Sequence, residues 1–262
     1  AAVRVQDHGG DGVNVLVTKP WAVNASEAER MIDTERRTGK LLMPWLPARW
    51  GVDLARLKEL LSEGAIGEVF LVRRAVCSFG TRNDWQMQRK YGGGYLLNWG
   101  AHIIDPPVVL LDSPVKSVYG VMKQTINPGD AEDVFLALMT LENGAVVQAE
   151  YTVAVEDLPS WYIQGTGGTI VIRGRELKVN RTTPKMPDDP TKYATMKSDE
   201  ARTDEETIEG AVYGDEKEIY REIAAAVNRT GEYSVGTTDA LALSRVFDAV
   251  RTSAKENRVV EL

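Results

Sequence analysis

The chain has 262 residues, of which 43% are hydrophobic and 26% charged, as in a soluble globular protein of one large or two ordinary domains. Its net charge of −7 disfavours a nucleic-acid-binding role, because such proteins usually carry a basic face. The apolar runs are too short and interrupted for a membrane span, and the single cysteine, Cys77, has no internal disulfide partner.

Two further features place the chain in the cytoplasm by default. A lone cysteine fits a reducing compartment. The first residues, AAVRVQDHGGDG, lack the charged-then-apolar order of a signal peptide.

The N-terminal part predicts alternating strands and helices. VNVLVTKP at 13–20 is Val-rich, as in a buried parallel strand. A helix follows, capped by Asn24 or Ser26, and runs through Thr38 to Gly39. A second short strand is expected at 40–47 and a leucine-striped helix at 52–64. This order is typical of a parallel α/β sheet.

From Gly67 onward the pattern changes to strands joined by turns, one of them Glu142-Asn143-Gly144. We expect a helix after the glycines at 92–112 and a polar surface excursion at 181–211. Two amphipathic helices should follow, the second capped by Thr237 or Thr238. The expected strands lie at 68–79, 115–124, 131–154 and 160–180, and the two helices at 215–231 and 237–257.

One candidate catalytic group lies in the stretch GGGYLLNWGAHIID at 92–105. In a helix starting near Gly94, Asn98 and His102 are four residues apart and share a face with Asp105. The glycines permit a close backbone approach, and a histidine can exchange a proton near neutral pH. The pattern alone slightly favours the alternative, a histidine that satisfies a buried hydrogen bond.

Other candidates follow the two predicted parallel strands, where α/β sheets collect ligands. Lys19-Pro20 closes the first strand, and the lysine could bind a phosphate or a substrate hydroxyl. Trp45 and Arg49 follow the second and could stack on a planar cofactor or a sugar ring. Trp85, in a polar loop, suggests a pocket wall. Surface, packing and loop-anchoring roles are the respective alternatives.

The sequence argues against a metal site and against two phosphate-binding motifs. One cysteine and two histidines cannot build a structural zinc site unaided, so we predict no metal. No Walker-type loop is present, and no Gly-x-Gly-x-x-Gly follows a strand near the N-terminus. The glycines at 165–168 belong to a predicted hairpin turn.

Several motifs, taken in order, resemble the glucose–fructose oxidoreductase/inositol dehydrogenase (Gfo/Idh/MocA) family. The resemblance runs from about residue 10 to the end. It rests on VLVTKP, LKELLSEGAIGEVF, GGGYLLNWGAHIID, IQGTGGTIVI and DAVRTSAKENRVVEL.

This resemblance implies a fold in three parts. Residues 1–66 would be the remaining C-terminal part of a Rossmann-type domain. Residues 67–236 would form an α+β substrate and oligomerisation domain with a large, mostly antiparallel open sheet flanked by helices. Residues 237–262 would form a C-terminal helix and tail packing back on the body.

The resemblance also implies an NAD(P)-dependent oxidoreductase acting on a secondary hydroxyl of a sugar, polyol or related carbohydrate. Lys19 matches the lysine between nicotinamide and substrate, and His102 matches the histidine of proton transfer. Asn98 stands where many members have Asp. On this basis catalysis is assigned to Lys19, His102 and Asn98, and substrate binding to Trp85, Asn98 and His102. Cofactor binding is assigned to Lys19, Pro20, Trp45 and Arg49.

This sequence differs from the pattern of the family in two ways that bear on function. Roughly 70–100 residues of the Rossmann unit, with its glycine fingerprint, are expected to be missing in front, since each βαβ unit takes ~30 residues. We therefore expect weak or absent NAD or NADP binding by these 262 residues themselves. Asn98 cannot act as an acid or base, and Thr18 replaces the usual Glu. The alternative is a non-catalytic, sugar-sensing or assembly member, and in either case the open sheet predicts a homodimer or homotetramer.

Overall fold

The computed structural model describes residues 13–262, so the start of the predicted unit 1–66 and the N-terminal stretch that lacks a signal-peptide pattern lie outside the described residues. Strands β1 (Val15–Val17) and β2 (Leu42–Pro44) pair in parallel, as predicted. Helix α1 (Ala25–Thr38) connects them. The Asn24 side chain accepts a hydrogen bond from the backbone of Glu27, and Gly39 ends the helix in the left-handed conformation.

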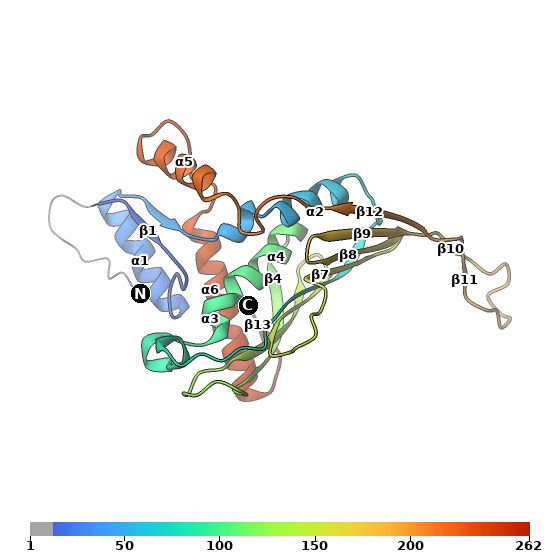
Figure 1. The fold of residues 1–262 in the computed structure, drawn as a ribbon, viewed down its shortest axis with the longest axis horizontal. Coiled ribbons are helices and arrows are strands. Elements are labelled where there is room, and N and C mark those ends of the chain that lie inside the picture. The colour runs from blue at the N-terminus through green and yellow to red at the C-terminus, as the bar shows by residue number, and fades with distance from the viewer. Residues whose placement is uncertain (1–12) are drawn as a thin grey trace.

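A short 3₁₀ helix, η1 (Pro47–Trp50), leads from β2 into helix α2 (Val52–Ser62). Leu54, Leu57 and Leu60 on α2 are buried in the main core, as the leucine stripe predicts. Figure 1 shows α2 lying beside a large sheet, near the edge strand formed by residues 202–207.

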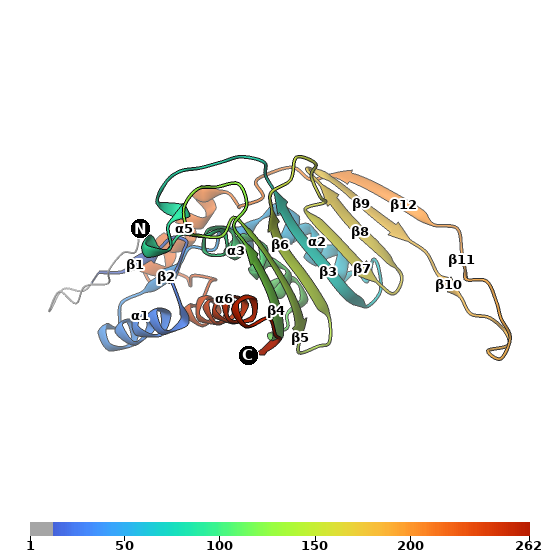
Figure 2. The ribbon, with the colours of Figure 1, turned by 90° about the horizontal axis from the view of Figure 1, so that it is seen from below.

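The large sheet has nine strands in the order β12-β9-β8-β7-β3-β6-β5-β4-β13. Only β3 and β6 pair in parallel, so the sheet is mixed but mostly antiparallel, as expected. Figure 2 shows helices α3 and α6 on one side of this sheet. The strands are β3 (Val69–Cys77), β4 (Val115–Lys123), β5 (Val134–Leu141), β6 (Val146–Thr152), β7 (Trp161–Gly165), β8 (Gly168–Arg173), β9 (Glu176–Arg181), β12 (Arg202–Thr207) and β13 (Val260–Glu261).

The region predicted as a surface excursion contributes an edge strand, which corrects that prediction. Strand β12 pairs antiparallel with β9, although it lacks apolar alternation. Polar cross-strand contacts hold it instead: Arg181 with Asp204, and Lys178 with Glu205 at 2.8 Å. The segment between β9 and β12 projects as an arm containing β10 (Pro184–Lys185) and β11 (Lys197–Ser198) (Figure 2).

The helix expected over 92–112 is divided into α3 (Tyr95–Ile103) and α4 (Asp105–Leu111). Pro106 and Pro107 follow the break, and neither can donate the backbone hydrogen bond that a continuous helix requires. The two 3₁₀ turns η2 (Trp85–Met87) and η3 (Arg89–Tyr91) precede α3.

Helix α6 (Thr237–Glu256) follows α5 (Glu216–Val227), and its cap differs from the prediction. Gly236, not Thr237 or Thr238, is the N-cap, because the Asp239 carboxylate accepts a hydrogen bond from the Gly236 N–H at 3.2 Å. Helix α6 packs against β4 and α1, and its Ala240 joins the small core around the parallel strands. It therefore links the parallel unit to the large sheet. Within residues 13–262, no helix combines the length and apolarity needed to cross a bilayer.

Candidate functional site

Lys19 lies where β1 ends, and its side chain reaches helix α3. Its ammonium Nζ lies 5.1 Å from the centroid of the Trp99 ring, a cation–π distance. The next peptide bond, Lys19–Pro20, is cis. The predicted cofactor-side lysine and the predicted catalytic helix therefore meet.

His102 lies one turn after Trp99 on α3 and is only 4% exposed. Its ring centroid is 5.9 Å from that of Trp99 and 4.8 Å from that of Tyr213. Its Nδ1 atom is buried and has no hydrogen-bond partner among the described residues. The structural alternative, a histidine satisfied by a buried hydrogen bond at Nδ1, is therefore not what the described residues show.

Burial and neighbouring charges lower the pKa of both His102 and Lys19. Burial, together with the positive charges of Lys19 and Arg74, lowers the pKa of His102 to about 3. Burial and the positive charge of Arg82 also lower the pKa of Lys19. At neutral pH His102 is thus an uncharged imidazole that can accept a proton beside a cationic lysine.

Asn98 faces a loop residue instead of His102. Its Nδ2 donates to Gln86 Oε1 at 2.5 Å, and the Arg82 guanidinium donates to the same oxygen. The neighbouring Trp85 is 43% exposed at the start of η2. The substrate-binding roles assigned to Asn98 and Trp85 stay predictions.

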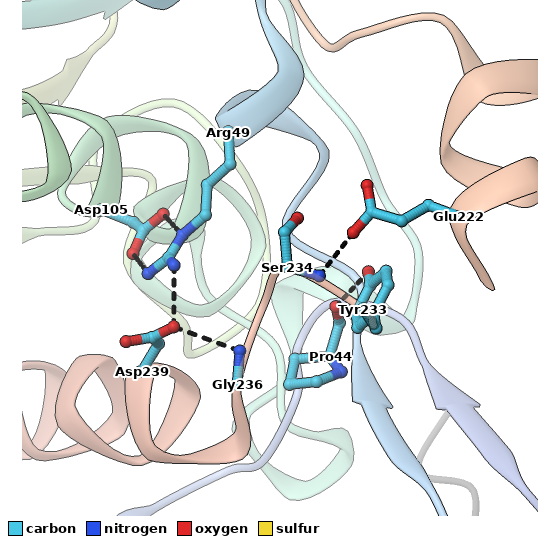
Figure 3. Close-up of polar contacts among 8 residues, drawn as sticks. All are labelled: Pro44, Arg49, Asp105, Glu222, Tyr233, Ser234, Gly236 and Asp239. Carbon is cyan, nitrogen blue, oxygen red and sulfur yellow. Dashed lines mark hydrogen bonds and ion pairs between the residues drawn. The ribbon is translucent and has the colours of Figure 1, made fainter. Parts of the chain in front are cut away.

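Asp105 does not join Asn98 and His102, although the helical spacing places them on one face. It begins α4 and receives two hydrogen bonds of 2.8 Å from Arg49 (Figure 3). Arg49 also donates to Asp239 at 2.9 Å. Although burial opposes it, the two carboxylates raise the pKa of Arg49, which therefore stays charged. These contacts join η1, α4 and α6.

The two other predicted cofactor residues near β2 have protein partners of their own. The ring of Trp45 lies 5.7 Å from that of Tyr220 on α5, and Arg49 is held by the carboxylates described above. Their contribution to cofactor binding stays a prediction. Within residues 13–262, no cluster of three or more His, Cys, Asp or Glu could hold a metal.

Sequence analysis missed a buried arginine behind the site. Arg74 on β3 is 3% exposed and donates to the Ser160 carbonyl at 2.9 Å, while its Nε has no partner in the described part of the chain. It lies 4.9 Å from the ring centroid of Trp161, whose Nε1 donates to Asp53 at 2.8 Å. The sequence did carry a signal for this arginine. Val72, Arg74 and Val76 lie on the same face of one strand, so a charged side chain stands between two apolar ones.

Tyr213, Arg82 and Gln86 also escaped sequence analysis. They lie in segments without periodicity before α5 and α3, and only the fold brings them near His102 and Asn98. No pattern in the sequence marks them.

Comparison with known proteins identifies the fold and its relatives. Residues 54–171 match the GFO/IDH/MocA C-terminal domain. The chain is 25% identical to the uncharacterized oxidoreductase YdgJ of Escherichia coli over 93% of this chain and 72% of that protein. It is 26% identical to scyllo-inositol 2-dehydrogenase (NADP(+)) IolW of Bacillus subtilis over 96% of this chain and 73% of that protein.

The structure superposes on solved structures of the same architecture. An NAD-binding protein from Listeria innocua matches 95% of this chain and 75% of its own, with a TM-score of 0.80 and 26% identity. The motifs around Lys19 and His102, the domain match over residues 54–171 and the fold agree, and the chain is similar to proteins of the Gfo/Idh/MocA family.

Proposed function

We propose that this protein is an NAD(P)-dependent oxidoreductase that acts on a secondary hydroxyl of a sugar, polyol or related carbohydrate. The observation that carries the proposal is the approach of Lys19, at the end of β1, to Trp99 on α3, whose ring lies 5.9 Å from that of His102. The assignment also draws on relatives such as IolW, whose name describes a dehydrogenase of an inositol.

The end of β1 fits a nicotinamide nucleotide. Lys19 and Pro20 would hold it there, and the next residue, Trp21, has a buried Nε1 donor without a partner among the described residues. When bound, the nucleotide would supply hydride exchange with the substrate carbon. Trp45 and Arg49 remain predicted contacts of the same group.

The protein's own residues would handle the proton and the charge. Neutral His102 would accept the proton of the substrate hydroxyl, because burial and neighbouring cations hold it unprotonated at neutral pH. The Lys19 ammonium would stabilise the negative charge that develops on that oxygen. Asn98 would orient the substrate through its side-chain oxygen, since its Nδ2 is held by Gln86.

The test is turnover by the gene product expressed from its own reading frame. NAD(P)H formation should appear with members of a panel of sugars and polyols. His102→Ala should lower kcat by roughly 10²-fold or more, the usual size of a lost acid–base group, with little change in nucleotide affinity. Tyr193→Ala, on the exposed arm, is the matched control and should leave turnover unchanged. Unaltered turnover in His102→Ala would remove His102 from the mechanism.

The second candidate is a non-catalytic, sugar-sensing or assembly protein of the same family. Asn98 favours it, because an amide cannot exchange a proton where many members carry an acid. Sugar binding without nucleotide reduction for any compound of the panel would support this candidate and contradict the enzyme.

We further propose that two or four copies assemble through the open face of the large sheet, in the cytoplasm. The sheet presents partly exposed apolar side chains there, among them Leu138 on β5 at 43% exposure. Cys77 has no disulfide partner, in keeping with a reducing compartment.

A further inference from the structure

We infer that the substrate carries a carboxylate, as in a sugar acid, and that Lys19 and Arg82 bind this group together. The inference rests on the proposed function only in taking the space beside His102 as the substrate site. It narrows the substrate class from neutral sugars and polyols to their acids.

Lys19 supplies the first observation, an ammonium without a counter-ion. It is half-buried, its ammonium lies over the Trp99 ring, and it forms no ion pair with a carboxylate in the described part of the chain. A partly desolvated charge is costly unless it is paired. A ligand that brings a negative charge would remove that cost.

Arg82 supplies the second cation at the same place. It lies in the loop before η2 and shares the oxygen of Gln86 with Asn98, which fixes it on the wall beside α3. Lys19 lies over Trp99, the residue that follows Asn98 on α3, so both cations reach the same turn of this helix. The positive charge of Arg82 accordingly lowers the pKa of Lys19. The Arg82 backbone N–H donates to Asn127 at 2.6 Å, which holds the loop in place.

The charges in this space leave one positive charge uncompensated. Asp84 lies 3.4 Å from Arg82 and also caps η2 by accepting from the Gln86 N–H at 2.9 Å, so it balances only one of the two cations. The buried Arg74 lies behind His102 and has Asp53 as its own counter-charge. His102 is neutral. The excess of one therefore fits a monoanion.

A carboxylate matches this arrangement better than a phosphate does. It carries one charge and two oxygens, which an ammonium and a guanidinium can share. A phosphate ester brings up to two charges and three oxygens, more than the single excess charge balances. A neutral polyol would leave the partly buried charge of Lys19 without a counter-charge.

The experiment is calorimetric titration with matched acid and polyol pairs, with and without NADH or NADPH. The pairs are gluconate with glucitol, galactonate with galactitol, and mannonate with mannitol, and glucose 6-phosphate is a separate arm. In at least one pair the acid should bind tenfold or more tightly than its polyol, with a preference that weakens as salt is added. Arg82→Gln should reduce this preference to within about threefold. Arg82→Lys should retain part of it.

The matched control is Arg221→Gln, which removes an exposed arginine paired with Glu218 on α5 and should leave every affinity unchanged. Equal or tighter polyol binding in every pair, no acid binding at all, an unchanged preference in Arg82→Gln, or tightest binding of glucose 6-phosphate would overturn the inference. Binding and turnover separate the two proposals. Preferential binding of the acids without reduction of NAD(P) would contradict the proposed function alone. Reduction of NAD(P) with polyols but with none of the acids would contradict this inference alone.

Discussion

At the scale of single residues, the site depends on keeping one imidazole uncharged. His102 is buried against Trp99 and Tyr213, and the nearby cations Lys19 and Arg74 oppose its protonation. The same lysine that would stabilise a substrate oxyanion therefore also favours the uncharged form of the imidazole. This arrangement ties the two candidate catalytic residues together electrostatically.

The low pKa of His102 predicts a stability that falls in mild acid. In the unfolded chain the imidazole takes up a proton near pH 6.5, whereas in the folded protein its pKa is about 3. The unfolded state thus binds more protons between these values, so the contribution is complete above pH 6.5 and is lost as pH falls toward 3. Between pH 6 and 5 the free energy of unfolding should drop by about 1 kcal/mol through this group.

Urea unfolding of the wild type and of His102→Gln at each pH measures that slope. The variant should show a shallower dependence by the same amount. Parallel curves for the two proteins would mean that His102 is protonated in the folded state or is not buried.

At the scale of elements, the start of α3 depends on Gly94. Its φ of 115° lies in a region open to glycine, and its N–H donates to the Gln86 carbonyl at 2.8 Å. A Cβ there would lie 2.3 Å from Glu132 Oε1, a buried carboxylate that accepts from the Leu96 N–H. The glycine run thus lets the segment that carries Gln86 and Arg82 approach helix α3.

Gly94→Ala should therefore destabilise the protein by about 3 kcal/mol, from backbone strain and the displaced carboxylate. Gly39→Ala is the control, since Gly39 has a φ of 64° and a Cβ added to it would meet nothing within 4 Å, and it should cost about 1 kcal/mol. Thermal or urea unfolding compares the two. An equal loss in the free energy of unfolding for the two variants would show that Glu132 does not crowd a side chain at position 94.

Elements with periodic apolar side chains or local capping residues could be predicted from the sequence. Elements held mainly by polar contacts could not. The caps at Asn24 and Gly39 and the leucines of α2 follow local rules, and the structure confirms them. Strand β12 has no apolar alternation, so nothing local distinguishes it from a loop. Likewise Lys19 and His102 stand in recognisable motifs, whereas Arg82 and Tyr213 reach the site only through tertiary packing.

At the scale of the whole molecule, α6 and the Arg49 ion pairs fix the parallel unit against the large sheet (Figure 3). Lys19 and His102 come from these two parts, so their approach depends on that junction. The opposite face of the sheet carries partly exposed apolar side chains and is the proposed contact between copies.

Leu138→Asp should disrupt that contact, because a charge buried in an apolar interface must be desolvated without a partner. Sedimentation velocity should then show a shift toward the monomer with an unchanged circular-dichroism spectrum. Val155→Asp, at an 81% exposed position off the strands, is the control. A wild type that already sediments as a monomer would contradict the proposed assembly.

The most direct test of the account is a double-mutant cycle on turnover between Lys19→Met and His102→Gln. If both residues act on one substrate oxygen, each single change should lower kcat by roughly 10²-fold or more. The kcat of the double variant should then be only slightly lower than that of the less active single variant. Losses that multiply in the double variant, or a single variant with unchanged kcat, would contradict the convergence of Lys19 and His102 on one reacting group.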